Sequence, residues 1–393
     1  MPAKRYTVGL FLLIALALAA VAAFNRVIDP FWYYRDIEIK GLNAIKPRFA
    51  RFERHVKPAL LARERPEAIV IGSSFAEIGF DPLDPAFTDN GRLRGYNYAF
   101  AGGSWEVGRC AFQHAVKHAP VKRIVMGIHA GALPEVDCTK VWQGMSVSTV
   151  ELLLSVKTLN NAIRTVVEQH KGRPSHTREG RYLYARDVPG AALRFREYFQ
   201  RHTSWRAQCL TPVPAKADAR LGAAVPKLDL SGLRAVIREA RQHGTEIAWV
   251  IYPQHVMWQE LEFACGDPQA RWRNMAAIAQ VVAEEALAGQ TQTQTPGHAT
   301  LWVFDGYDAL RGERVFGREP TYWQDPEHFN FELGARMLAT IYGREQDFGT
   351  RVTPENIAGI YARLVAQREQ FLATADWLYS DLRALAAPLP AVR

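Results

Sequence analysis

The stretch Glu67-Ala-Ile-Val-Ile-Gly-Ser-Ser-Phe-Ala-Glu77 decides the predicted fold. A short β-branched run that stops at glycine and small hydroxyl residues is typical of a buried strand that ends in a turn. In an open α/β sheet, ligands bind beyond the carboxyl ends of the strands, and a serine there is well placed to act as a nucleophile. Gly72-Ser73-Ser74 is also ordinary turn and helix-capping sequence. This stretch alone therefore leaves both interpretations open.

Further strand and helix patterns follow this stretch and predict a parallel sheet. Strands are expected over residues 94–100, 123–129, 246–252 and 300–304. Helices are expected over residues 105–118, 229–242, 268–287 and 331–342. Because strands and helices alternate along the chain, we expect an α/β fold with helices on the faces of the sheet.

The rest of the chain divides around this α/β region. We expect a membrane anchor at residues 1–26, a membrane-proximal neck at 27–65, an α/β domain at 66–345 and a C-terminal helix at 346–393. The polar, helical sequence from about 140 to 230 is interpreted as an insertion in the domain. The C-terminal helix is expected to be amphipathic and up to about thirty residues long, because its apolar residues recur at three- to four-residue steps.

The N-terminus has the composition of a membrane segment. Lys4 and Arg5 precede an uncharged run from Val8 to Phe24. A helix over this run would be about 26 Å long, at the short edge of a membrane crossing. Ala20-Val21-Ala22 also fits the cleavage site of a signal peptide, but the apolar run is longer than a typical signal core, which favours a retained anchor. Both interpretations export the remaining chain.

Aromatic residues lie just beyond the apolar run, at positions 31–34. Such a cluster fits the belt of aromatic side chains at a membrane surface. Packing against the rest of the protein is an equally good interpretation.

Charge and cysteine content narrow the class of protein. The formal net charge is +8, with no long run of Lys or Arg. This mild excess suits an anionic surface or polymer and does not argue for nucleic acid. The four cysteines form no CxxC pair, so we expect no zinc site. In an oxidising compartment they could form up to two disulfides, and Cys209 with Cys265 is the preferred pair because both lie in loop-like sequence.

Asp325-Pro-Glu-His328 is a candidate for acid–base chemistry. A histidine that serves as a base needs its tautomer and orientation fixed, and a nearby carboxylate does this by accepting the ring N–H. The alternative is a helix start, with Asp325 as N-cap and Pro326 in the first turn. Asp305, at the end of a predicted strand, is a second candidate for the orienting acid.

The segment from Asn97 to Ser104 offers a further candidate. A glycine at a strand end, such as Gly102, leaves a backbone N–H free to bind an oxyanion. A tight turn followed by an N-cap at Ser104 explains the same residues without a ligand. His114 and His118 are one helical turn apart, but no third ligand has a suggestive spacing, so a solvated helix face is favoured over a metal site.

The order of these segments resembles the SGNH, or GDSL-like, hydrolase superfamily. The first block of that family corresponds to Gly72-Ser73-Ser74, the second to Asn97–Gly102 and the last to Asp325–His328. The resemblance implies a flavodoxin-like three-layer α/β/α fold with a central parallel sheet. It implies Ser74 as nucleophile, His328 as general base, Asp325 as its orienting partner, and an oxyanion hole from the N–H groups of Ser74 and Gly102. No cofactor is implied.

The predicted anchor narrows the resemblance to the membrane-attached, exported branch. That branch includes alginate O-acetylation proteins and partner proteins of teichoic acid D-alanylation. The likeness implies a bacterial inner-membrane protein with a periplasmic domain, a membrane-bound O-acyltransferase as partner, and an envelope polysaccharide as acyl acceptor.

One block departs from the family pattern. The third block normally supplies an asparagine to the oxyanion hole, whereas this chain has Gly127-Ile128-His129 and no asparagine there. His129 is either a substitute donor or, as we favour, a buried structural residue. Asn97 and His129 are therefore only accessory candidates. The expected function is a serine-dependent acyltransferase or esterase, and the alternative is an inactive scaffold subunit of an envelope-modification complex.

Overall fold

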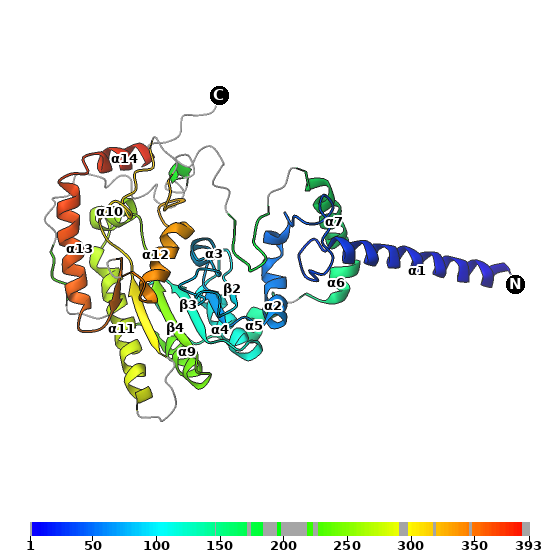
Figure 1. The fold of residues 1–393 in the computed structure, drawn as a ribbon, viewed down its shortest axis with the longest axis horizontal. Helices are drawn as coiled ribbons and strands as arrows, with labels where there is room; N and C mark the ends of the chain where they lie inside the picture. The colour runs from blue at the N-terminus through cyan, green and yellow to red at the C-terminus, as the bar shows by residue number, and fades with distance from the viewer. Residues whose placement is uncertain are drawn as a thin grey trace. The chain divides into compact units, whose positions relative to one another are not determined.

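The computed structural model describes residues 2–145, 147–170, 174–183, 195–197, 218–222, 227–290, 298–316, 320–345 and 348–386. The chain divides into two compact units (Figure 1). Unit 1 comprises Met1–Glu64 and Cys138–Tyr184, and unit 2 comprises Arg65–Asp137 and Ala185–Arg393. The first part of the expected insertion thus belongs with the N-terminal segment, and each unit is described by itself.

Unit 1 is built from short helices around the end of one long helix. The long helix α1 spans Pro2–Ile28, and the others are α2 (Glu53–Glu64), α5 (Cys138–Gln143), α6 (Thr149–Leu154) and α7 (Val156–Glu168). α1 packs against α6 and α7, and the Asn25 side chain donates a hydrogen bond to the Leu153 carbonyl at 2.8 Å. The predicted neck therefore contains a helix, α2, and is part of a packed unit.

α1 is the one helix in the described part of the chain that is long and apolar enough to cross a membrane. Its side chains from residue 4 to residue 20 are exposed. C-terminal to this segment, Asn25 and Ile28 are buried. The helix therefore has an exposed N-terminal part and a packed C-terminal end.

The aromatic cluster after α1 is packed inside unit 1. Phe31 stacks on Phe52 with ring centroids 4.0 Å apart, and Trp32 meets Phe49 edge-on. Phe31 is 1% exposed. The expectation of a membrane-surface belt is wrong for Phe31 and Trp32, because both rings lie in the core.

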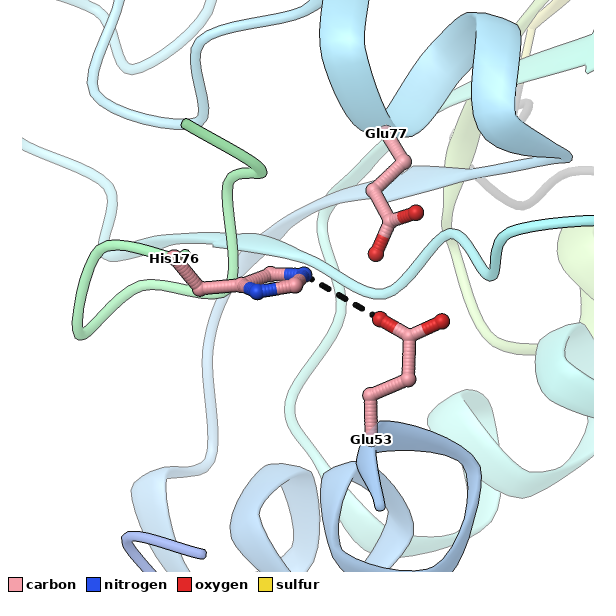
Figure 2. A group of neighbouring side chains, drawn as sticks. All are labelled: Glu53, Glu77 and His176. Atoms are coloured by element: carbon pink, nitrogen blue, oxygen red, sulfur yellow. Dashed lines mark hydrogen bonds and ion pairs between the residues drawn. The ribbon is translucent and has the colours of Figure 1, made fainter. Parts of the chain in front are cut away.

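A buried charged group also stabilises unit 1. The Glu53 carboxylate is hydrogen-bonded to Nε2 of His176 at 3.1 Å, as Figure 2 shows, and Nζ of Lys57 lies 3.3 Å from the same carboxylate. All three side chains are almost fully buried. The Glu53–His176 contact joins α2 to a segment more than a hundred positions later in the chain.

Unit 2 contains a six-stranded sheet in the order β2-β1-β3-β4-β5-β6. Strands β1 to β5 run parallel, and β6 is antiparallel to β5. The strands are β1 (Ala68–Ile71), β2 (Gly95–Asn97), β3 (Arg123–Ile128), β4 (Glu246–Ile251), β5 (Ala299–Val303) and β6 (Thr350–Val352). The central strands β1, β3 and β4 are buried along nearly their whole length, which explains their continuous apolar sequence.

Helices connect these strands and pack in two groups (Figure 1). α4 packs against α9 and α9 against α11, whereas α3 packs against α12. Right-handed crossovers that move in opposite directions across a sheet place their helices on opposite faces. The bounds are α3 (Ser74–Gly79), α4 (Trp105–His118), α9 (Ser231–Gln242), α10 (Val256–Cys265), α11 (Pro268–Gln290) and α12 (Phe331–Ile341).

The C-terminal region differs from the predicted single helix. It begins with β6 at the sheet edge and continues as two helices, α13 (Ile357–Leu372) and α14 (Trp377–Ala386). The chain turns between them so that Leu378, Leu382 and Leu385 of α14 are buried. The apolar spacing was read correctly as helical, but it does not reveal the break.

Cys110, Cys138 and Cys265 are disulfide-bonded, and no free cysteine occurs among the described residues. The preferred pair includes Cys209, which lies outside the described residues.

Candidate active site

Ser74 lies at the carboxyl edge of the sheet, where β1 turns into α3. Ser74 is the first residue of α3, and Ser73 is its N-cap. Gly72, between β1 and this turn, has a φ of 154°. A side chain at Gly72 would collide with the Tyr252 hydroxyl, so only glycine fits here. The turn thus brings the Ser74 hydroxyl to the edge of the sheet.

A hydrogen-bonded chain joins Ser74, His328 and Asp325. Oγ of Ser74 lies 2.8 Å from Nε2 of His328, and Nδ1 of the same ring lies 2.8 Å from Oδ2 of Asp325. The carboxylate oxygen accepts a proton, so Nδ1 carries the ring hydrogen and Nε2 is left to accept from the serine. The side chains of His328 and Asp325 are each 14% exposed, so the imidazole is accessible but sheltered.

Asp325 also holds the turn that carries His328. Its Oδ1 accepts the backbone N–H groups of Glu327 and His328, at 2.9 Å and 2.8 Å. The following helix, α12, begins only at Phe331 and has Asn330 as its N-cap. The interpretation of Asp325 as an N-cap of that helix is therefore wrong, although its carboxylate does cap backbone N–H groups in the turn.

Tyr252 supports the serine turn from the next but one strand. The Ser73 N–H donates to the Tyr252 hydroxyl oxygen at 2.9 Å. A side chain at Gly72 or at Gly127 would collide with Tyr252, so both glycines make room for it. Burial raises the pKa of the Tyr252 phenol to about 12, which keeps it neutral. The phenol therefore acts as a fixed neutral acceptor beneath Ser73.

The Phe75 ring packs against the imidazole of His328. Its ring stacks on His328 with centroids 4.3 Å apart and an interplanar angle of 13°. The same ring stacks on Tyr252 and meets His129 edge-on. Because Phe75 directly follows Ser74, the α3 turn positions both the hydroxyl and an aromatic surface against His328.

Gly102 belongs to a loop that packs directly against the serine turn. The Phe100 N–H donates to the Gly72 carbonyl at 3.1 Å, and a Cβ added at Gly103 would lie 3.1 Å from the Gly72 carbonyl oxygen. Gly102 has a φ of 61°. Among the described residues, neither the Ser74 N–H nor the Gly102 N–H donates to an acceptor. Both groups can therefore serve a bound anion.

Asn97 is buried away from the candidate reaction centre. Its Nδ2 donates to the carbonyls of Ala76, Glu77 and Phe80 at the end of α3, and its Oδ1 accepts the Ala99 N–H. Asn97 is 0% exposed. Its amide thus fixes α3 to β2 and is fully engaged in doing so.

His129 is exposed at the end of β3, which contradicts the expectation of a buried structural residue. Its ring meets Phe75 and Tyr252 edge-on, with centroids 5.2 Å and 5.1 Å away. His129 sits where the third block of the pattern would place its asparagine, beside the serine turn. This position lets an imidazole N–H reach a ligand at the sheet edge.

The other two candidates are engaged elsewhere. Asp305 is buried and pairs with Arg271, whose Nη2 lies 2.7 Å from its Oδ2; burial raises the pKa of this carboxyl. Its Oδ1 accepts the Gln254 N–H, so Asp305 stabilises the ends of β4 and β5. Nδ1 of His114 is hydrogen-bonded to the Tyr98 hydroxyl at 3.2 Å, which favours a structural role over a metal site.

Sequence patterns had missed Tyr252 and Phe75. Phe75 stood in the quoted first stretch, and an aromatic residue directly after the proposed nucleophile was the available signal. Tyr252 ends a strand predicted on apolar grounds, and the paired glycines that admit its ring are recognisable only once β1, β3 and β4 are aligned.

No protein-family model matches the chain, and no curated protein matches it.

Proposed function

We propose that this protein is a serine-dependent esterase or acyltransferase of the SGNH type. The observation that carries the proposal is the hydrogen-bonded chain from Ser74 through His328 to Asp325. A hydroxyl, an imidazole and a carboxylate that are hydrogen-bonded in this order are the groups that activate a serine as a nucleophile. The strand order 2-1-3-4-5 of the parallel sheet supports a flavodoxin-like fold.

In the first half of the reaction, Oγ of Ser74 attacks the carbonyl carbon of an ester. The Ser74 proton passes to Nε2 of His328, and the Asp325 carboxylate stabilises the resulting imidazolium. The bond between the carbonyl carbon and the leaving oxygen then breaks. His328 returns the proton to that oxygen, which leaves as an alcohol, and the acyl group stays on Ser74.

The second half reverses the roles. Nε2 of His328 takes a proton from water or from a sugar hydroxyl, whose oxygen attacks the acyl carbon. The bond to Ser74 breaks, and the Ser74 oxygen recovers a proton from His328. Water gives an esterase and a sugar hydroxyl gives a transferase, with the same three side chains in both.

The developing oxyanion needs donors that face it. The N–H groups of Ser74 and Gly102 are our assigned donors, since both lie at the sheet edge without another acceptor among the described residues. His129 is the side chain at this edge that can replace the missing asparagine. A single such donor contributes about 10²–10³ in rate.

The proposed place of action is supported by α1, which is long and apolar enough to cross a membrane. We propose a single N-terminal pass at a bacterial inner membrane, with unit 2 on the periplasmic side. An envelope polysaccharide would be the acyl acceptor, and a membrane-bound O-acyltransferase would supply the acyl group.

An activity-based probe tests the proposed nucleophile. A fluorophosphonate should label the wild-type protein at Ser74, and Ser74→Ala should abolish the label. Ser73→Ala is the matched control, because it removes the neighbouring hydroxyl and leaves the Ser74–His328 contact in place. An unlabelled, folded wild-type protein would refute the proposal and favour the inactive scaffold, for which the absent third-block asparagine is the supporting observation.

A further inference from the structure

A small cavity opens beside the serine turn in unit 2. Its volume is about 120 Å³. Ser73, which precedes Ser74, and Gly103, which follows Gly102, line the cavity, whereas Ser74 and Gly102 themselves do not. The remaining wall comes from the start of α4 and the segment after β3. The cavity therefore opens next to the turn that carries the proposed nucleophile.

The wall of this cavity is apolar and made partly of glycine. Most of its side chains are apolar, and His129, Ser73 and Ser104 add polar groups. The apolar side chains belong to Trp105, Met126, Ile128, Ala132, Leu133 and Tyr252. Five glycines also line it, at positions 72, 103, 108, 127 and 131. At Gly131 an added Cβ would meet nothing within 4 Å. Glycine backbone thus forms part of the cavity wall, and the side chains in that wall are mostly apolar.

The size of the cavity limits what it can hold. A cavity of about 150 Å³ accommodates benzene, with its six carbon atoms. By the same measure this cavity has room for about five non-hydrogen atoms. An acetyl, propionyl or butyryl group fits, whereas an octanoyl chain does not.

The cavity wall is held in place by hydrogen bonds. The Ala130 carbonyl accepts Nδ2 of Asn274 at 3.0 Å, and the Leu133 N–H donates to the Asp229 carbonyl at 2.7 Å. The Pro134 carbonyl accepts the Trp105 indole N–H at 2.6 Å. Because both ends of the 130–134 segment are tied to other elements, the cavity is preformed and cannot widen without loss of these bonds.

The charges around the cavity disfavour a cationic occupant. None of the residues that line it is acidic. A cation contacts the wall from outside, because Nη2 of Arg271 donates to the Tyr252 carbonyl at 2.8 Å. An ammonium group in this cavity would have mostly apolar neighbours and no carboxylate in the wall to balance its charge, which is a costly environment for a cation.

We propose that this cavity is the acyl pocket of the enzyme and that it selects short, uncharged acyl groups of two to four carbons over long-chain and aminoacyl groups. This inference rests on the proposed function of Ser74. It names the class of acyl donor: an acetyl-type ester, and not an ester of an amino acid or a fatty acid.

Activated aryl esters test this selectivity without an acceptor. We would measure kcat/KM for p-nitrophenyl acetate, butyrate and octanoate, together with acylation of Ser74 by intact mass. The isobutyryl and D-alanyl esters form a matched pair, because they differ by an ammonium in place of a methyl group. The pocket predicts at least about tenfold preference for butyrate over octanoate and about 100-fold for isobutyryl over D-alanyl.

A cavity-enlarging variant locates the selectivity. Leu133→Ala removes three carbon atoms from the wall and should raise the octanoate-to-acetate ratio of kcat/KM about tenfold or more, since each buried methylene adds transfer free energy. Leu364→Ala, a buried position on α13, is the matched control and should leave the ratio unchanged.

The outcomes separate this inference from the proposed function. A labelled Ser74 with no preference among the esters, with no acylation by any of them, or with an octanoate-to-acetate ratio that Leu133→Ala does not change, overturns the acyl pocket alone. A folded protein whose Ser74 is neither labelled nor acylated overturns both proposals.

Discussion

Asp325 performs two tasks with the two oxygens of one carboxylate. Oδ1 accepts two backbone N–H groups and so holds the turn, while Oδ2 accepts the ring N–H of His328. The three-residue spacing allows one carboxylate to make both contacts, because a tight turn brings the backbone and the ring of His328 within its reach. The fold of the turn and the orientation of the base therefore depend on one residue.

Substitution of Asp325 can separate these tasks. Asp325→Asn keeps an oxygen for the two backbone N–H groups but presents an amide to Nδ1 of His328, which favours the wrong tautomer. We expect ester hydrolysis to fall about 10²–10⁴-fold with less than about 1 kcal/mol lost in urea unfolding. Asp325→Ala should lose both the activity and about 1–3 kcal/mol. An Asn variant with wild-type activity would exclude Asp325 as the orienting group.

Single residues of the site were predictable where the information is local in sequence. Ser74 and Gly72 share one turn, and Asp325 and His328 share another, so short motifs identify them. Tyr252 acts through a hydroxyl that reaches Ser73 across a sheet, 179 positions away. His129 was expected to be buried, yet β3 ends at Ile128 and His129 beyond it is exposed. Such features depend on register and strand ends, which no local pattern specifies.

At the scale of elements, the start of α10 contacts the turn that carries His328, the proposed base. The His255 N–H donates to the Pro326 carbonyl at 3.1 Å. Its Nδ1 accepts the Met257 N–H as the N-cap of α10, so Nε2 carries the hydrogen that is donated to the Glu313 carbonyl at 2.9 Å. His255 is 0% exposed. One residue thus contacts both parts: the imidazole of His255 caps α10, and its backbone N–H binds the turn that carries His328.

This arrangement predicts a pH dependence of stability. Burial lowers the pKa of His255 from 6.5 to about 4 in the folded protein. Between pH 6.5 and pH 4 this histidine binds a proton in the unfolded chain but not in the folded chain. The contribution of His255 to the free energy of unfolding is therefore fully present above about pH 6.5 and is lost as the pH falls toward 4. The loss attributable to His255 is up to about 3 kcal/mol.

The His255→Asn variant isolates this contribution. Asparagine can still cap α10 but carries no titrating ring, so the variant should be less stable than wild type at pH 7.5 and lose less stability between pH 6.5 and 4. Urea unfolding at several pH values measures both slopes. All other ionisable groups are the same in both proteins, so their contributions cancel in the comparison. Parallel pH profiles would show that His255 is not the titrating group.

Elements were predictable where burial and period agree. The predicted helix over residues 105–118 coincides with α4, and the predicted strands contain β1 to β4. The short strand β6 was missed because an edge strand of three residues has no clear alternation. α10 was missed because its first six residues are all buried, the polar Gln259 and Glu260 included, so no amphipathic period marks it. Packing between distant segments decides both.

At the scale of the molecule, a buried charge cluster ties the C-terminal helices to the rest of unit 2. The Glu260 carboxylate of α10 pairs with Arg368 of α13 at 2.6 Å, and it accepts the hydroxyls of Tyr307 and Tyr379 at 2.7 Å and 2.8 Å. Glu260 and Arg368 are both 0% exposed. One carboxylate therefore joins α10, α13, α14 and the segment after β5.

Removing one charge of this pair should destabilise unit 2 strongly. Glu260→Gln leaves the Arg368 guanidinium buried without a counter-charge, and we expect a loss of about 3–5 kcal/mol in urea unfolding. Tyr379→Phe removes one hydrogen bond and should cost only about 1 kcal/mol. The double variant Glu260→Leu, Arg368→Met should be more stable than Glu260→Gln. Equal stability of Glu260→Gln and wild type would show that the cluster is not held as described.

The division of α1 into a bare and a packed part predicts how the chain can be shortened. Side chains 4–20 are exposed, whereas Asn25 is buried and donates to the Leu153 carbonyl. Deletion of residues 1–20 should release the protein from membranes into the soluble fraction with its melting temperature changed by less than about 3 °C, because no described buried group is lost.

Asn25→Ala in the full chain should instead stay with the membrane but lower stability by about 1–3 kcal/mol, since it leaves a buried carbonyl unpaired. Fractionation and thermal unfolding of the two variants distinguish anchoring from packing. If the shortened chain still sediments with membranes, another surface binds the bilayer, and the single-pass proposal fails.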